Sequence, residues 1–190
     1  MRIIAGEAGG RKLRAPDTKG TRPATDRVRE AVFSSIGNWV VDSTVGDLYA
    51  GSGSFGLEAL SRGASSAVFV ENGRKAIQAL RHNVETVGLG GTVVESSVQD
   101  YLNRANHRFH LVFIDPPWDQ PTSRLEEDLA KLDRFLLTNA EVVISRRHTD
   151  DVPVPPETWR VATDKRYGDT RIVRYEKVEH DDDGPMPGEF

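Results

Sequence analysis

From residue 44 onward, short apolar runs alternate with segments in which apolar residues recur at helical spacing. Runs rich in valine and isoleucine predict buried strands, and apolar positions three and four residues apart predict the helices that cover them. The predicted strands span residues 44–50, 66–72, 91–96, 109–115 and 140–146, and the predicted helices span residues 55–62, 73–87, 100–105 and 123–136. This alternation predicts an α/β fold with a mostly parallel sheet that is covered on both faces.

The two ends of the chain depart from this rhythm. Residues 158–168 and 169–178 alternate apolar and polar positions around Gly168-Asp169, which predicts an antiparallel hairpin that completes a seven-stranded sheet. Residues 25–36 have the periodicity of an amphipathic helix, and residues 1–24 predict a short β-rich arm. The predicted organisation is therefore an arm (1–24), a main domain (25–178) and an acidic, disordered tail (179–190).

The composition of the 190 residues narrows the classes of protein. Cysteine is absent, which excludes disulfides, thiolate metal sites and a cysteine nucleophile. No apolar run approaches the roughly 18 residues of a membrane span, and the first residues lack the apolar core of a secretory signal. The five histidines are scattered and predict no metal site. We expect a cytoplasmic protein with no membrane partner, and we expect it to be a monomer.

Charge is distributed unevenly along a chain whose net charge is −4. Residues 1–30 carry eight basic side chains against four acidic ones, a net charge of +4, whereas residues 179–190 carry five acidic side chains and no Lys or Arg. A basic arm can bind phosphates even on an acidic protein, because the local potential depends on charges within about 8 Å. The charge alone fits a solvated arm equally well. Arg146, Arg147, Lys165, Arg166 and Arg171 would extend this basic surface.

A glycine loop follows the first strand of the main domain. Residues 51–56 (GSGSFG) match G-x-G-x-x-G between a strand and a helix, where backbone N–H groups can approach a ligand closely. Glu71 lies 18 residues beyond Gly53, at the end of the second strand, where an acid can bind ribose hydroxyls. These features suit NAD and S-adenosylmethionine equally, because both contain adenosine.

Two aspartates bear on the choice of cofactor. Asp47 precedes the loop, where a carboxylate could meet the cationic amino group of S-adenosylmethionine and would disfavour the pyrophosphate of NAD. Asp47 could also serve as a hydrogen-bond acceptor that stabilises the loop. Asp100 follows the third strand and could bind the adenine amino group, or it could cap the helix that begins there.

The fourth strand ends abruptly in FIDPPW, residues 113–118. Proline cannot extend a strand, so Pro116 and Pro117 fix a rigid corner at the carboxyl end of the sheet, where ligands of such folds bind. Asp115 and the Pro116 carbonyl can accept the two N–H groups of an exocyclic base amine, so that its lone pair points at a methyl donor. Trp118 offers a stacking face for the base, worth roughly 1–3 kcal/mol. No metal ion is required.

Together these motifs resemble the S-adenosylmethionine-dependent amino-methyltransferases of nucleic-acid bases, which have a Rossmann-like class I fold. The stretches MRIIAGEAGGRKLRAP and TRPATDRVREAVFSSI, followed by the glycine loop, further resemble the bacterial 16S rRNA guanine-N2 methyltransferase family, from residue 1 to about 175. That family modifies guanine 966 of the small ribosomal subunit. Its members usually carry Tyr or Phe at the position of Trp118, so a role that depends on a phenolic hydroxyl does not transfer to this chain.

The resemblance implies a set of site residues. Asp115, Pro116, Pro117 and Trp118 would form the catalytic corner. Arg11, Lys12, Arg14 and Arg22 would contact 16S rRNA, in the small subunit or in its assembly intermediate. Thr25 and Arg27 would lie beside the methionine end of the cofactor or the RNA, although Thr25 or Asp26 also suits a helix cap. The cofactor-binding residues would be Asp47, Tyr49, Ala50, Gly51, Ser52, Gly53, Glu71, Asn72, Val98, Asp100, Thr25 and Arg27.

Three other functions remain open from the sequence. The Asp-Pro-Pro-aromatic corner also occurs in DNA adenine-N6 methyltransferases, and only the N-terminal resemblance favours guanine. A non-catalytic RNA-binding assembly factor could keep the same fold. An NAD-dependent oxidoreductase is a weaker alternative, because no acid or base for hydride transfer lies near the glycine loop in the sequence.

Overall fold

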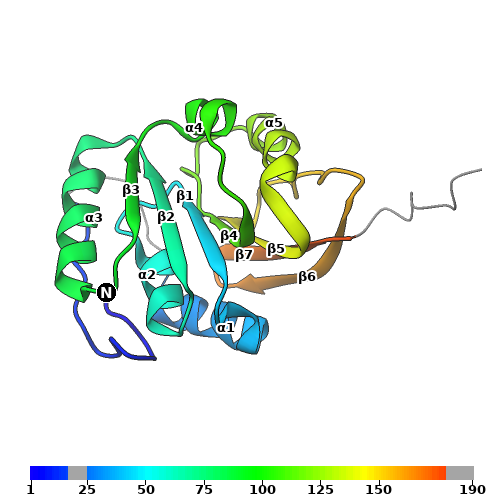
Figure 1. The fold of residues 1–190 in the computed structure, drawn as a ribbon. Coiled ribbons are helices and arrows are strands. Elements are labelled where there is room, and N and C mark those ends of the chain that lie inside the picture. Colours follow the sequence, from blue (N-terminus) through cyan, green and yellow to red (C-terminus); the bar gives the residue numbers. More distant parts are fainter. Residues whose placement is uncertain (17–24, 179–190) are drawn as a thin grey trace, which may run out of the picture.

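The computed structural model describes residues 1–16 and 25–178 and has a seven-stranded sheet at its centre (Figure 1). The strands are β1 (Thr44–Leu48), β2 (Ser66–Glu71), β3 (Thr92–Glu95), β4 (Phe109–Ile114), β5 (Leu136–Arg147), β6 (Trp159–Tyr167) and β7 (Thr170–Lys177). Their spatial order is β3-β2-β1-β4-β5-β7-β6. The first five strands run parallel, and β7 is antiparallel to both β5 and β6.

Helices cover both faces of this sheet (Figure 1). On one face, α1 (Asp26–Ile36), α2 (Ser54–Ser61) and α3 (Arg74–Val87) enclose a first apolar core. On the other face, α4 (Val98–Arg104) and α5 (Thr122–Leu132) enclose a second. The predicted α/β Rossmann-like class I fold, with its C-terminal antiparallel hairpin, is confirmed. None of the helices in the described ranges is long and apolar enough to cross a membrane.

Element boundaries differ from the prediction around two helices. α4 begins at Val98 rather than residue 100, because the Ser97 hydroxyl accepts a hydrogen bond from the Asp100 N–H and so starts the helix earlier. α5 ends at Leu132, and a 3-10 turn, η2 (Asp133–Phe135), leads directly into β5. Leu136, predicted on the helix, therefore pairs with Phe109 of β4. A second 3-10 turn that the pattern did not predict, η1 (Gly37–Val40), follows α1.

The first residues of the arm are docked on α2. The sequence predicts an arm that is rich in β-structure. Within residues 1–16 it contains one isolated antiparallel bridge, between Arg2 and Lys12. The backbone N–H groups of Ile4 and Ala5 donate to the buried Glu58 carboxylate. A Cβ atom at Gly6 would lie 1.8 Å from the Ser61 carbonyl oxygen, so only glycine permits this approach. The division into three regions stays a prediction, and the tail lies outside the described residues.

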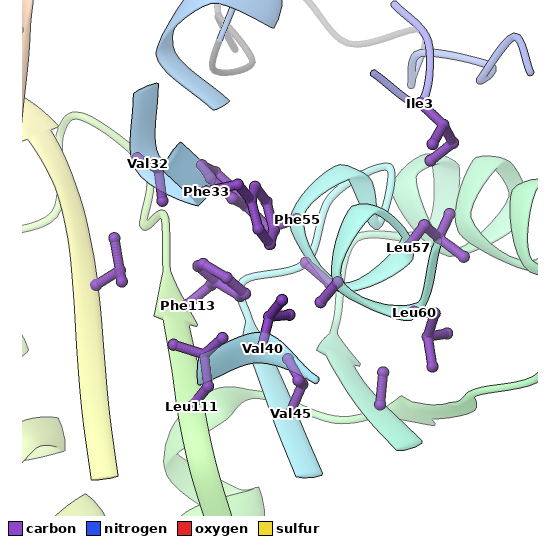
Figure 2. Close-up of a cluster of buried hydrophobic side chains, with 14 of the residues drawn as sticks. Ile3, Val32, Phe33, Val40, Val45, Phe55, Leu57, Leu60, Leu111 and Phe113 are labelled. Carbon is purple, nitrogen blue, oxygen red and sulfur yellow. The ribbon is translucent and has the colours of Figure 1, made fainter. Parts of the chain in front are cut away.

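Three phenylalanines anchor the strand that leads to the Asp-Pro-Pro-Trp corner (Figure 2). The ring of Phe113, in β4, lies 4.9 Å from that of Phe55 in α2 and 5.3 Å from that of Phe33 in α1. All three side chains are buried. Because Phe113 precedes Asp115 by only two residues, this packing fixes the position at which β4 ends.

Candidate active site

The carboxyl ends of β1, β2 and β4 meet at one edge of the sheet. Leu48 of β1 pairs with Val70 of β2 and with Ile114 of β4, so the residues that follow these three positions lie together. The glycine loop, Glu71 and Asp115 therefore surround a common edge, as the strand pattern predicts.

The glycine loop has a tightly turned backbone. Tyr49, Gly51 and Gly53 all have positive φ, and the Gly53 N–H donates to the Ala50 carbonyl at 2.7 Å. A Cβ atom at Gly53 would lie 2.5 Å from Leu80, whereas one at Gly51 would meet nothing within 4 Å. A side chain at Gly53 would have to displace the Leu80 side chain and adopt a positive φ, whereas Gly51 leaves an open approach to the backbone. Ser52 is buried, and its carbonyl accepts from the Asn83 side chain.

Glu71 holds the loop in place. One of its carboxylate oxygens accepts the Gly51 N–H at 2.8 Å, and the other accepts the N–H groups of Asn72 and Gly73. A carboxylate that accepts three backbone hydrogen bonds is fixed in orientation. It can still accept hydroxyl donors through its remaining lone pairs.

Asp47 is almost fully buried, and its Oδ2 accepts the Gly56 N–H at 2.9 Å. This contact ties β1 to the first turn of α2, which is the loop-stabilising role. Burial raises the pKa of Asp47 well above its ordinary value, and the nearby charges of Asp115 and Glu71 raise that pKa further. The edge is therefore a site where carboxylates repel one another and where a cation would relieve the repulsion. Its contact with the cofactor amino group stays a prediction.

A cavity of about 190 Å³ opens beside Glu71. Of the predicted cofactor residues it brings together Tyr49, Glu71, Asn72 and Val98. Asp100 is exposed and instead accepts the Ser97 hydroxyl at 2.8 Å. The full lining is Tyr49, Val70, Glu71, Asn72, Ser96, Ser97, Val98, Gln99, Gln120 and Arg124.

Several of these lining residues are not among the cofactor residues that the sequence predicts. Ser96 and Ser97 follow β3, and the rule that ligands bind at the carboxyl ends of strands could have found them. Gln120 and Arg124 reach the cavity only because the chain folds back after Trp118, with the Gln120 N–H donating to the Pro117 carbonyl. No local pattern marks that return.

Tyr49 connects the cavity to α5. Its hydroxyl donates to Asp128 Oδ2 at 2.7 Å and accepts from Gln120 Nε2 at 2.9 Å. Burial raises the pKa of Tyr49, and the hydrogen bond to Asp128 adds to this. Tyr49 has a positive φ, and its side chain packs against the core on the α4–α5 face of the sheet. The glycine loop and the chain after Trp118 are thereby joined.

In the Asp-Pro-Pro-Trp corner, residues 115–118, Asp115 is partly exposed as a residue, but its carboxylate is desolvated. Desolvation raises the pKa of Asp115 from 3.8 to about 6, although a hydrogen bond from Ser145 lowers it. Ser145 is the β5 neighbour of Asp115, since Ile114 pairs with Ile144. Pro116 is buried and Pro117 is exposed, while Trp118 is partly exposed. Ser145 is a further site residue, which the sequence does not predict.

The predicted basic surface near this corner is only partly present. Arg146 is buried, with 4% of its surface exposed, and its Nη2 donates to the Gln120 carbonyl, so it does not belong to the surface. Strand alternation buries Arg146, because it shares the α5 face of β5 with Val142 and Ile144. Arg171 forms an ion pair with Asp164. Arg147, Lys165 and Arg166 are exposed.

The predicted RNA-contacting residues of the arm have different surroundings. The guanidinium of Arg11 donates to the carbonyls of Thr86 and Val87 at the end of α3. The backbone of Arg14 is held by Asn83 at both its N–H and its carbonyl, which leaves the side chain exposed. Lys12 is also exposed.

The segment before α1 is described only in part. Arg22 lies outside the described residues. Thr25 caps α1 by accepting the Val28 N–H, and Arg27 is exposed in the first turn. Within the ranges 1–16 and 25–178, no three His, Asp or Glu side chains form a potential metal site.

Comparison with known proteins relates the chain to methyltransferases. The "Ribosomal RNA small subunit methyltransferase D" of Escherichia coli (strain K12) is 34% identical over 178 residues, 93% of this chain and 90% of that protein. The "Putative rRNA methyltransferase YlbH" of Bacillus subtilis is 33% identical, over 93% of this chain and 99% of that protein.

Solved structures agree with these relatives. The structure of the putative methyltransferase yhhF from Escherichia coli superposes with a TM-score of 0.84 at 34% identity, covering 94% of this chain and 98% of that one. The putative methyltransferase SMU.776, complexed with SAH, has a TM-score of 0.65 at 16% identity, over 83% of this chain and 50% of that one, which shows a likeness of fold alone.

One protein family matches almost the whole described chain. The family described as "Conserved hypothetical protein 95" matches residues 1–176, and the resemblance read from the sequence motifs is confirmed. The chain therefore belongs to the Conserved hypothetical protein 95 family and is a relative of the ribosomal RNA small subunit methyltransferases D.

Proposed function

We propose that this protein transfers a methyl group from S-adenosylmethionine to the N2 amino group of guanine 966 in 16S rRNA of the small ribosomal subunit. The observation that carries the proposal is the placement of a desolvated carboxylate, Asp115, and a partly exposed aromatic ring, Trp118, on the corner that follows β4, beside the glycine loop. The names of the relatives support ribosomal RNA as the substrate. The choice of guanine N2 is the finer part of the proposal.

The residues present suit S-adenosylmethionine. Gly51 leaves its backbone approachable, and Glu71 stands fixed at the rim of a cavity lined by Asn72 and Val98. Burial, together with the nearby charges of Asp115 and Glu71, raises the pKa of Asp47, so a cationic ligand is favoured at this edge and the pyrophosphate of NAD is disfavoured. When bound, S-adenosylmethionine supplies an electrophilic methyl group.

Asp115 would position the amino group of the base. An exocyclic amine is a weak nucleophile because its lone pair is delocalised into the ring. A carboxylate that accepts one of its N–H groups favours a pyramidal nitrogen with the lone pair directed outward. Once the nitrogen has gained the methyl group and a positive charge, it must lose one proton. A carboxylate whose pKa is raised to about 6 accepts that proton more readily than an ordinary aspartate.

The corner also limits how much the base can move. Pro116 and Pro117 fix the backbone, the Phe113 ring is locked between Phe33 and Phe55, and Trp118 offers a partly exposed aromatic surface. The groups that contact the base are thus already oriented before it binds, which lowers the entropic part of the barrier to methyl transfer. A base within a helix would have to be turned out of its stack to reach this corner.

The test uses small ribosomal subunits from a strain that lacks this modification. Wild-type protein and labelled S-adenosylmethionine should incorporate about one methyl group per subunit, and nucleoside mapping should locate it as N2-methylguanosine at position 966. Naked 16S rRNA and double-stranded DNA serve as parallel substrates. Label on adenine or on DNA would overturn the assignment, and cofactor binding with no transfer to any RNA would favour a non-catalytic assembly factor.

A further inference from the structure

Two successive arginines at the end of β5 have opposite environments. Arg146 is buried, donates to the Gln120 carbonyl and lies 3.1 Å from Asp150. Arg147 is exposed, and its guanidinium carbon lies 4.9 Å from the centre of the Trp118 ring. Across residues 1–16 and 25–178, no hydrogen bond or ion pair of the Arg147 guanidinium is found. Its N–H groups are therefore available to a ligand.

Strand alternation places Arg147 on the substrate side of the sheet. Side chains two residues apart in a strand share a face, so Arg147 lies on the face of Ser145. Ser145 donates to Asp115, and Val143, two residues earlier, packs in the same core as Phe113. Arg147 and Asp115 therefore approach the corner from one face, with Trp118 within reach of the guanidinium.

We propose that Arg147 contacts the RNA substrate, an inference that rests on the proposed function. Its guanidinium covers one face of the Trp118 ring and leaves the opposite face for the target base. The outward N–H groups of Arg147 then bind a backbone phosphate next to the target nucleotide. Arginine suits both tasks, because its planar group stacks on aromatic rings and pairs with phosphate oxygens through parallel hydrogen bonds.

This pairing gives a physical reason for tryptophan at position 118. Among aromatic side chains, tryptophan attracts a cation over its face most strongly. The indole therefore gains from the Arg147 contact as well as from stacking on a base. The cation–π contact restricts the orientation of the Trp118 ring and keeps the Arg147 guanidinium at the rim of the site.

The experiment compares Arg147→Ala and Arg147→Lys with wild-type protein on small subunits that lack the modification. Arg108→Ala is the matched control, since Arg108 is also exposed but immediately precedes β4, at the amino ends of the parallel strands. For Arg147→Ala we expect the KM for subunits to rise about 5- to 20-fold, with kcat and the affinity for S-adenosylmethionine little changed. Arg147→Lys keeps the charge and loses the planar stacking, so its KM should be intermediate.

Salt dependence separates a phosphate contact from a structural role. Loss of one phosphate contact should reduce the slope of log(kcat/KM) against log[salt] by about 0.7–0.9 in Arg147→Ala and leave it unchanged in Arg147→Lys and Arg108→Ala. An unchanged KM and slope in Arg147→Ala, or an equal change in Arg108→Ala, would overturn the inference. If wild-type protein fails to methylate the subunits, the proposed function fails by itself, and filter binding of RNA by the same variants still decides the role of Arg147.

Discussion

The glycine loop and the Asp-Pro-Pro-Trp corner lie side by side at one edge of the sheet, yet the carboxylates of the two regions differ in how many hydrogen bonds they accept. In the glycine loop nearly every polar group has a partner: Asp47 accepts from Gly56, and Glu71 accepts from Gly51, Asn72 and Gly73. In the corner, one side-chain hydrogen bond from the described residues, that of the Ser145 hydroxyl, opposes the desolvation of Asp115, and the pKa of Asp115 rises to about 6.

This difference suits two ligands, a cofactor at the loop and a substrate at the corner. The glycine loop is organised by its own hydrogen bonds, so a cofactor would meet a surface that is already formed. The corner keeps a carboxylate in a poorly solvated place, where it gains most from a substrate that donates N–H groups. Variants of the corner, variants of the loop and a pH series test whether the two regions differ in this way.

The largest effect is expected for Asp115. Asp115→Asn keeps the shape of the side chain but removes the acceptor charge, so methyl transfer should fall by about 10²–10⁴-fold, as for loss of a positioned proton acceptor. Asp115→Ala should abolish transfer. Calorimetry should find the affinity for S-adenosylmethionine largely intact in both variants. Near-normal rates of RNA methylation in either variant would refute the proposed mechanism.

Trp118 should show the next largest effect. Trp118→Ala removes a stacking surface worth roughly 1–3 kcal/mol, so kcat/KM for the subunits should fall by about 5- to 150-fold. Trp118→Phe keeps a ring, although one that attracts Arg147 less strongly, and it should remain active. Steady-state kinetics on subunits measures both variants. A Phe variant as impaired as the Ala variant would show that the indole has a role other than stacking.

Gly51 tests the cofactor side. Gly51→Ala places a methyl group in the open approach to the loop and forces alanine into a positive φ that costs about 1–2 kcal/mol, so the dissociation constant for S-adenosylmethionine should rise about tenfold or more. Gly168→Ala is the matched control, since Gly168 has φ of +60° and open space at the tip of the β6–β7 hairpin. Equal loss of cofactor affinity in both variants would mean that strain alone is responsible.

The smallest effect is the dependence of activity on pH. Because Asp115 must be ionised to accept a hydrogen bond and then a proton from the amino group, kcat/KM for the subunits should fall below a pH of about 6, by up to about tenfold per pH unit. The folded-state pKa is raised, so the native state gains stability from this group at low pH and loses it as pH rises from 3.8 to about 6. Asp115→Asn should therefore raise the melting temperature relative to wild type at pH 7 but not at pH 4. A flat activity profile down to pH 5 would contradict the raised pKa.

Much of this protein follows from its sequence alone. The alternation of apolar runs with helical periodicity defines a parallel sheet with a final hairpin, because both periodicities are local properties of the chain. The positions of the glycine loop, Glu71 and the Asp-Pro-Pro-Trp corner follow as well, because parallel strands bring their carboxyl ends to one edge.

The burial, the pKa and the contact partners of these residues depend on the tertiary structure. The return of the chain after Trp118 brought Gln120 and Arg124 to the cavity, and the neighbouring strand brought Ser145 to Asp115. Strand alternation within the folded sheet buried Arg146 and left Arg147 exposed on the Trp118 ring. Burial, pKa and pairing depend on segments far apart in the sequence, so they are properties of the packed sheet and its helices, and no local pattern contains them.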